Sequence, residues 1–258
     1  VCGLSRSRPK PNTVSDASPP DENVRRSVAP PWNCATSLPA SRARLIAVKP
    51  RLRPAPYLRP TEEALPPPRF RKDAKRGSLE GFLFPALYEF TQATTARELV
   101  ADQLTAFRRR FGSVHLRYAR SKNLTPYDIL IIASMIEKET AVPSERRLVA
   151  AVIYNRLRNR MPLGIDATIR YGLDIPGTES LTKEALRSDS PYNTRLRPGL
   201  PPTPIANPGL ASLEAAANPA RNVDYLYYVR KPKSLSHYFT ANESDFLRKV
   251  CEYGYASK

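Results

Sequence analysis

Residues 129–163 form the stretch around which the chain is organised, and from Ile131 onward they read IIASMIEKETAVPSERRLVAAVIYNRLRNRMPL. The first helix of this stretch is apolar almost all round as far as Ile136, and it ends in two carboxylates, Glu137 and Glu139. A helix that is hydrophobic on every side is typical of the interior of a domain. We therefore predict a central, buried helix that carries an acid at its C-terminal end.

This helix has a clear start signal in residues 124–129, LTPYDI. Thr125 is the predicted N-cap, Pro126 occupies the first helical position, and Asp128 closes a capping box. Pro143 interrupts the chain after the two glutamates. A second, amphipathic helix is predicted to follow, because apolar residues recur at helical spacing at Leu148, Val149, Val152, Ile153 and Leu157.

The segments on either side contain shorter elements. Further helices are predicted at residues 95–111, 166–172, 182–187 and 209–217 and from Asn242 onward. Strands are predicted at residues 78–90, bent at Pro85, and at 224–229 and 237–240, of which the last two form a hairpin. Gly112 is the predicted stop of the first of these helices, and Asp166 and Asn207 are predicted N-caps. The predicted fold class is α+β, a mostly helical domain with a small antiparallel sheet.

Residues 1–77 differ in composition from the rest of the chain. They hold 14 of the 27 prolines, and 16 Lys and Arg against 6 acids. Without a sustained apolar period, this Pro/Arg-rich segment cannot bury enough surface to offset its chain entropy. We predict a disordered tail at 1–77, a folded domain at 78–252 and a short C-terminal tail at 253–258. A shifted reading frame upstream of Gly77 is a further hypothesis for this composition.

Charge and cysteine usage limit the classes of function. A formal net charge of +17 indicates a polyanionic partner such as nucleic acid, acidic lipid or an acidic wall polymer, although most of it lies in residues 1–77. Cys2, Cys34 and Cys251 are widely spaced and odd in number, and only His115 and His237 could be co-ligands, so no zinc site is expected. No run approaches about 18 apolar residues, as a membrane span requires. The chain begins with Val, which indicates a fragment.

The two glutamates point to acid chemistry by a single carboxyl group. Two helical positions apart, they lie about 200° apart around the axis and do not face each other. Glu139 sits at the helix C-terminus, where the macrodipole and burial both raise a carboxyl pKa, and a raised pKa suits a general acid. The alternative is an exposed glutamate paired with Lys138, Arg146 or Arg147. No motif of a serine or cysteine nucleophile is present.

Polar residues gather near a proline-rich loop at 190–204. Tyr192, Asn193 and Asn207 are of the types that bind sugar hydroxyls and amides, and they are equally common as turn and cap residues. Long loops of this kind often carry function. The sequence alone leaves both interpretations open.

Five blocks of the sequence resemble, in order and spacing, those of the bacterial endolytic murein transglycosylase family, which is also called YceG-like. The blocks are LEGFLFPALYEF, ASMIEKETAVPSERRLVAAVIYNRL, MPLGIDATIRYGL, SPYNTRLRPGLPPTPIANPGLASLEAAANPA and YLYYVRKPKSLSHYFT. The resemblance runs from Ser78 to Phe246. It departs from the family at Ala86 and Leu87, which replace Asp and Thr, and at Gly164, which replaces a glutamine. Residues 1–77 show neither the membrane anchor nor the LysM-like domain of the family.

The resemblance implies a lyase that cuts nascent peptidoglycan strands internally and leaves 1,6-anhydro-N-acetylmuramic ends. Its catalytic glutamate is the second of the E-K-E-T block, which is Glu139 here. One residue acts first as acid and then as base, without a metal or other cofactor. The substrate-binding residues that the resemblance implies are Asn155, Asp166, Thr168, Tyr192, Asn193 and Asn207.

The resemblance also implies partners and a location. The substrate would be peptidoglycan glycan strands, the partners wall synthases, and the result termination of strand elongation; no nucleic acid is expected. The location would be the extracytoplasmic face of the cell membrane, reached through an anchor that this chain lacks. The alternative is a non-catalytic basic module that holds an anionic wall polymer or nucleic acid.

Overall fold

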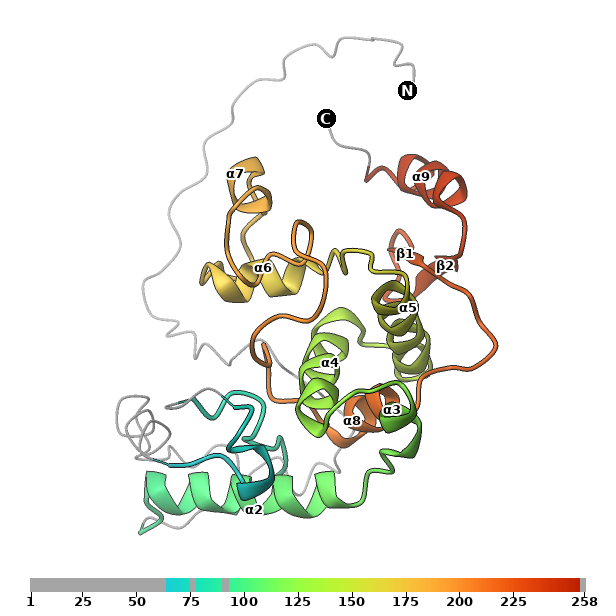
Figure 1. Cartoon of the computed structure of the whole chain (residues 1–258). Coiled ribbons are helices and arrows are strands. Elements are labelled where there is room, and N and C mark those ends of the chain that lie inside the picture. Colours follow the sequence, from blue (N-terminus) through green and yellow to red (C-terminus); the bar gives the residue numbers. More distant parts are fainter. Residues whose placement is uncertain (1–63, 75–77, 90–92, 256–258) are drawn as a thin grey trace, which may run out of the picture. The chain divides into compact units, whose positions relative to one another are not determined.

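The computed structural model describes residues 64–74, 78–89 and 93–255, all of which belong to one compact unit, Arg51–Lys258 (Figure 1). The predicted disorder of residues 1–77 therefore falls largely outside the described residues. In chain order the elements are η2 (Pro68–Phe70), α2 (Ala96–Gly112), α3 (Arg117–Ser121), α4 (Pro126–Glu139), η3 (Pro143–Glu145), α5 (Arg146–Arg158), α6 (Asp166–Gly172), α7 (Lys183–Leu186), α8 (Leu210–Ala217), β1 (Tyr227–Arg230), β2 (His237–Thr240) and α9 (Glu243–Glu252). This confirms the mostly helical fold with a small antiparallel sheet. Among these described helices, none has the length and apolarity needed to cross a membrane.

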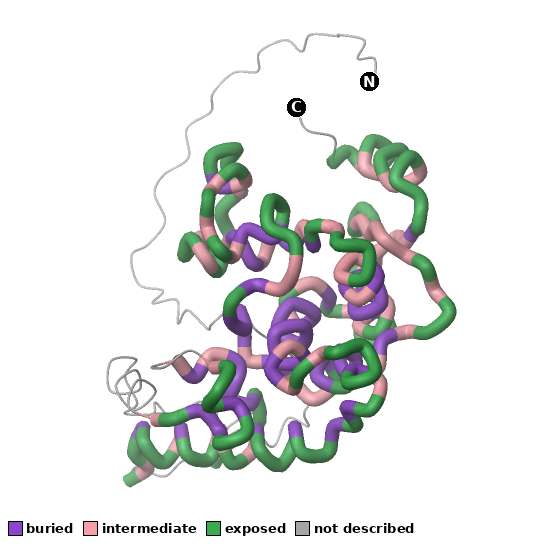
Figure 2. Tube along the Cα trace, viewed as in Figure 1, coloured by how far each residue is buried: buried purple, intermediate pink, exposed green. Residues whose placement is uncertain are grey.

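The helix α4 is the centre of the hydrophobic core, as the sequence predicts. Every residue from Ile129 to Ile136 is buried (Figure 2). At its start, the Thr125 hydroxyl accepts a hydrogen bond from the Asp128 N–H at 3.1 Å, and the Asp128 carboxylate accepts one from the Thr125 N–H at 2.8 Å. Burying each large aliphatic side chain contributes roughly 1.5–3 kcal/mol. The apolar run therefore makes α4 the rigid base on which the rest of the unit is built.

The helices α5 and α8 make the most extensive contacts with α4, and α6 also contacts it. Three of the α8 side chains in the core, Ala215, Ala216 and Ala217, are small, and Leu213 is buried beside them. Small side chains let two helix backbones approach closely. The end of α4 is thereby fixed relative to α5 and α8, which places Glu137 and Glu139 in defined surroundings.

The predicted strands at 78–90 are wrong, because residues 78–89 contain turns and irregular segments but no strand. Their aromatic residues serve the core instead. The Phe82 ring meets the rings of Phe70 and Phe107 at centroid distances of 5.2 Å each. The Leu83 N–H donates to the Asn207 side chain at 2.9 Å rather than to a neighbouring strand. Phe70 precedes Gly77 and is nevertheless buried in the same core.

Several predicted helix ends also need correction. Gly112 is the last residue of α2, and the C-cap is Ser113. Asp166 is the first residue of α6 rather than its N-cap, which is Ile165. The N-cap of α8 is Gly209 and not Asn207, whose side chain is engaged with residues 80 and 83. The short helix α3 was not predicted, since no side-chain cap marks its start.

The predicted hairpin is confirmed. β1 and β2 pair antiparallel, with Tyr227 opposite Thr240 and Tyr228 opposite Phe239. The first strand begins at Tyr227 rather than at the predicted Asp224. The helix α9 follows, and the Asn242 side chain accepts from the Asp245 N–H at 3.0 Å, as the cap signal predicts.

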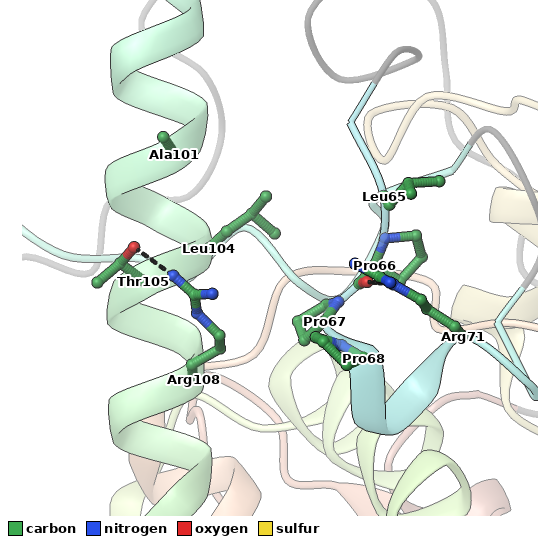
Figure 3. Close-up of a pocket in the computed structure, with 9 residues that line it drawn as sticks. All are labelled: Leu65, Pro66, Pro67, Pro68, Arg71, Ala101, Leu104, Thr105 and Arg108. Atoms are coloured by element: carbon green, nitrogen blue, oxygen red, sulfur yellow. Dashed lines mark hydrogen bonds between the residues drawn. The ribbon is translucent and has the colours of Figure 1, made fainter.

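A pocket of about 180 Å³ lies between the segment before η2 and the helix α2 (Figure 3). Leu65, Pro66 and Pro67 line one side, and Leu104 and Arg108 line the other. None of the site residues predicted from the sequence contributes to it. This pocket is therefore separate from the acid at the end of α4.

Candidate active site

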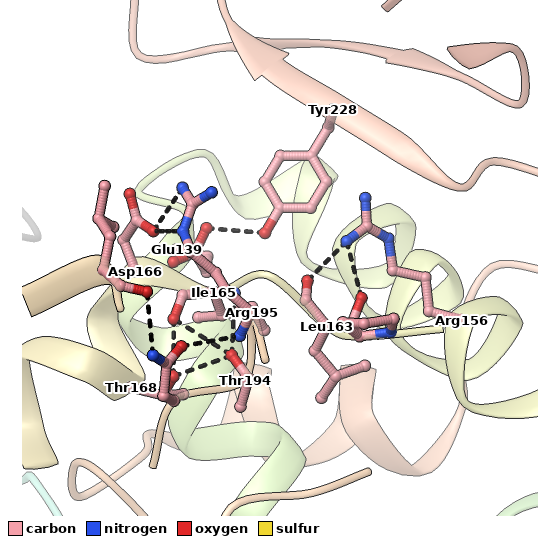
Figure 4. A network of polar contacts seen from close by, with 12 residues as sticks. Glu139, Arg156, Leu163, Ile165, Asp166, Thr168, Thr194, Arg195 and Tyr228 are labelled. Carbon is pink, nitrogen blue, oxygen red and sulfur yellow. Dashed lines mark hydrogen bonds and ion pairs between the residues drawn. The ribbon is translucent and has the colours of Figure 1, made fainter. Parts of the chain in front are cut away.

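Glu139 is the last residue of α4, and its side chain is half-buried. Its Oε2 atom accepts a hydrogen bond of 2.7 Å from the Tyr228 hydroxyl (Figure 4). Tyr228 belongs to β1, so two elements distant in sequence meet at this carboxyl group. Arg146 and Arg147, which the sequence offered as ion-pair partners, instead donate to Ser212 and to the carbonyl of Asn218.

Burial raises the pKa of Glu139 above its ordinary value, and the negative charge of Asp166 adds to this rise. The Tyr228 hydrogen bond and the electrostatic influence of His237 and Arg195 act in the opposite direction but do not outweigh burial. Burial and the nearby Glu139 also raise the pKa of Tyr228 well above its ordinary value, so the phenol stays protonated and donates. The predicted raised carboxyl pKa at this helix end is thus confirmed in direction. A carboxyl group of this kind can hold a proton and give it up.

Asp166 and Arg195 form an ion pair next to this acid. Nε and Nη2 of Arg195 each lie 2.7 Å from the same oxygen of Asp166, Oδ1. The two side chains are 44% and 46% exposed, so both remain accessible to a solute. Of the six substrate-binding residues predicted from the sequence, Asp166 is the one whose charge acts on Glu139.

A small hydroxyl network fixes the position of Asp166 (Figure 4). The hydroxyl groups of Thr168 and Thr194 lie 2.9 Å apart, and Thr168 donates to the Ile165 carbonyl at 2.7 Å. The Ile165 N–H donates back to the Thr194 hydroxyl at 3.0 Å. Thr168 is fully buried. It therefore holds the start of α6 in place through its hydrogen bonds to Ile165 and Thr194.

The side-chain amides of Asn155 and Asn193 are likewise used within the protein. Asn155 donates to the carbonyls of Val223 and Tyr225, at 3.0 Å each, and so ties the chain leading into β1 to α5. Asn193 donates to the Leu186 and Ser188 carbonyls. Its oxygen accepts from the Arg195 N–H at 3.1 Å. These two amides position the segments that carry Tyr228 and Arg195.

Tyr192 and Asn207 lie in other contacts. The Tyr192 hydroxyl is 2.8 Å from that of Thr203. The Asn207 amide donates to Glu80 at 3.2 Å, and burial raises the pKa of Glu80. Both side chains are half-buried, and neither is hydrogen-bonded to Glu139. A substrate contact at these two positions stays a prediction, as does the catalytic role of Glu139.

Glu137 has a different task from Glu139. Its Oε2 atom accepts from the Ser212 hydroxyl at 2.6 Å and from the Gly209 N–H at 3.2 Å. These donors lie at the N-terminus of α8, where unpaired N–H groups and the helix dipole favour a negative charge. The two carboxylates diverge as their spacing predicts, and Glu137, rather than Asn207, is the side chain that accepts hydrogen bonds at the N-terminus of α8.

Three features of this site were not predicted: Tyr228, Arg195 and the pair formed by Glu145 and His237. Nδ1 of His237 lies 2.7 Å from Oε2 of Glu145, and the His237 N–H donates to the other oxygen at 2.9 Å. Their side chains are only 8% and 10% exposed. The two residues are 92 positions apart, so no local pattern could have indicated the pair.

Comparison with known proteins places these residues in a wider context. A model of the YceG-like family matches residues 27–252 of the chain. The chain is 36% identical over 196 residues to an endolytic murein transglycosylase of Streptococcus pneumoniae strain R6, covering 74% of this chain and 34% of that protein. It is 37% identical over 162 residues to an endolytic murein transglycosylase of Bacillus subtilis strain 168, covering 63% of this chain and 44% of that protein.

A solved crystal structure is also similar. It is that of a YceG-like protein from Listeria monocytogenes, with a TM-score of 0.68 and 30% sequence identity. The match covers 80% of this chain and 71% of that one. The chain spans about a third of the length of its streptococcal relative.

Proposed function

This chain belongs to the YceG-like family, and on that basis we propose that it is a peptidoglycan lytic transglycosylase with Glu139 as its acid and base. The observation that carries the proposal is the single half-buried carboxyl group at the end of α4, whose pKa is raised. Relatives over most of the chain bear the name endolytic murein transglycosylase. The proposed cut lies inside the glycan strand, between N-acetylmuramic acid and N-acetylglucosamine.

The chemistry requires one proton-carrying group. Protonated Glu139 donates to the glycosidic oxygen as the bond from C1 of the muramic sugar to that oxygen breaks. The C6 hydroxyl of the same sugar then attacks C1, and the Glu139 carboxylate takes the proton of that hydroxyl. The glutamate ends in its starting state. One strand gains a free 4-hydroxyl, and the other gains a 1,6-anhydro ring.

We assign the other predicted residues according to their contacts. Asp166 and its partner Arg195 are accessible and charged, so they are the proposed contacts for polar groups of the glycan. Thr168, Asn155 and Asn193 are buried and act as supports. Tyr192 and Asn207 are proposed to line the path of the strand next to the loop 190–204.

The biological setting follows from the same proposal. An internal cut in a nascent strand would end its elongation, in the company of wall synthases. The site of action would be the extracytoplasmic face of the cell membrane.

The test uses purified protein and uncrosslinked glycan strands, with the products analysed by mass spectrometry. Wild type should yield 1,6-anhydro ends, Glu139→Gln should yield none, and Glu214→Gln, an exposed change on α8, should match wild type. Identical products from wild type and Glu139→Gln would contradict the proposed role of Glu139. Binding of strands by wild type without any cleavage would favour a non-catalytic wall-polymer module.

A further inference from the structure

The Glu139 carboxyl group makes an asymmetric set of contacts. Its Oε2 atom accepts from Tyr228 at 2.7 Å, while Oε1 has no hydrogen-bond partner among the described residues. As long as the Tyr228 hydroxyl donates to Oε2, this oxygen acts as the acceptor of the hydrogen bond. When Glu139 is protonated, the proton is therefore left to Oε1.

The Tyr228 ring is itself held in place. It meets the His237 ring edge-on at a centroid distance of 5.4 Å and the Phe239 ring at 5.7 Å. His237 is in turn fixed by Glu145, which accepts from both its ring and its backbone N–H. Since a carboxylate only accepts, the ring nitrogen Nδ1 is the donor. A buried pair with both partners satisfied is a rigid contact. The chain of contacts runs from Glu145 through His237 and Tyr228 to Glu139.

We propose that Tyr228 is a positioning residue for the Glu139 acid, and that the Glu145–His237 pair holds the Tyr228 ring in place. By binding Oε2, Tyr228 orients the carboxyl group so that Oε1 is the oxygen that donates the proton and takes it back. Tyr228 does this without contacting the sugar. This inference rests on the proposed function of Glu139.

The proposal has a consequence for the pH dependence of the reaction. The charged or titratable groups acting on Glu139 are Asp166 on α6, Arg195 in the loop after α7, and His237 and Tyr228 on the hairpin. Of these, the Tyr228 hydrogen bond is the strongest influence that lowers the pKa of Glu139. A general acid must be protonated, so the rate falls as pH rises through its pKa. Removing the hydroxyl should move this alkaline fall to higher pH.

The test compares Tyr228→Phe with Tyr227→Phe, a matched control on the same strand whose hydroxyl makes no hydrogen bond to any described residue. The kcat on uncrosslinked glycan strands is measured as a function of pH. Tyr228→Phe should lower the plateau kcat about tenfold, as expected for the loss of one hydrogen bond to a charged group, with little change in KM. Its alkaline limb should lie at higher pH than in wild type and Tyr227→Phe. An unchanged kcat or an unshifted limb would overturn the proposal.

A second variant keeps the test independent of folding. Incorporation of 3-fluorotyrosine at position 228 preserves the ring and makes the phenol a stronger donor. The alkaline limb should then move to lower pH, opposite to Tyr228→Phe. A limb that moves in the same direction for both variants would refute a role through this hydrogen bond.

The role of His237 is tested in two backgrounds. His237→Leu should lower kcat in the wild-type background and have no further effect in Tyr228→Phe, because it acts through Tyr228. Equal losses in both backgrounds would remove His237 from the proposal. Failure of the proposed function looks different: wild type itself would then produce no anhydro ends.

Discussion

Glu137→Ala tests whether the first of the two glutamates is structural. The substitution leaves the Ser212 hydroxyl and the Gly209 N–H without the carboxylate that accepts from them at 2.6 and 3.2 Å. A hydrogen bond to a charged group contributes about 1.5–3 kcal/mol, and a negative charge at a helix N-terminus adds about 0.3–1 kcal/mol. The weaker geometry of the 3.2 Å contact and partial exposure reduce the sum. We expect the free energy of unfolding to fall by about 2–4 kcal/mol.

The assay is urea denaturation followed by circular dichroism at the helix signal. Glu214→Ala, an exposed change on α8, is the control and should stay within about 0.5 kcal/mol of wild type. A loss of less than about 0.5 kcal/mol for Glu137→Ala would show that its contact with α8 does not stabilise the fold. A structural role for Glu137, as opposed to an acid role for Glu139, would then be refuted.

Three further changes test the core and the acid. Because the pKa of Glu139 is raised in the folded state, its contribution to the free energy of unfolding is fully present below its ordinary pKa and is lost as pH rises through the folded-state pKa. Glu139→Gln removes the buried charge, so it should raise the melting temperature more at pH 7 than at pH 4. A larger rise at pH 4 in thermal melts would contradict the raised pKa. Phe82→Ala should cost about 3–5 kcal/mol in urea denaturation, since its ring is 1% exposed and contacts two other phenylalanines; a cost below about 1 kcal/mol would refute a close-packed aromatic cluster. Gly81→Ala should cost about 2–4 kcal/mol, because Gly81 has φ +89° and an added Cβ would lie 2.7 Å from Pro204; an unchanged denaturation midpoint would show that the turn relaxes freely.

The parts of the fold that follow local rules could be read from the sequence. Thr125 and Asn242 cap their helices as predicted, because a cap depends on residues within one turn. The aromatic run at 78–90 could not be read in this way. The Phe82 ring packs against Phe70 and Phe107, and the Leu83 N–H donates a hydrogen bond to the Asn207 side chain. Contacts with residues outside the run therefore override its strand propensity.

The same distinction between local patterns and long-range contacts applies to the candidate site. Glu139 could be singled out from one helix and its C-terminal end, and the direction of its pKa shift was predicted, whereas the burial that raises this pKa comes from the assembled chain. Tyr228 reaches it from 89 residues away, and His237 reaches Glu145 from 92 residues away. Asn207 was predicted to cap α8 from its local pattern, but its side chain donates to Glu80 instead. Glu137 accepts the hydrogen bond at the start of α8 in its place. Local patterns identify single functional groups, and only the assembled chain shows what each group contacts.

The hairpin that carries Tyr228 has only two strands among the described residues, and a two-stranded hairpin has little stability of its own. It is held to α5 by side-chain anchors such as those of Asn155 and Arg156, which bind the carbonyls of Tyr225 and Leu226. Elements of this kind open locally at lower free energy than a buried core helix. On gentle warming the hairpin should therefore detach while α4 remains folded, so that the acid loses its partner before the protein loses its fold. Activity would then report on docking of the hairpin, and faster amide exchange in β1 than in α4 would mark the same event.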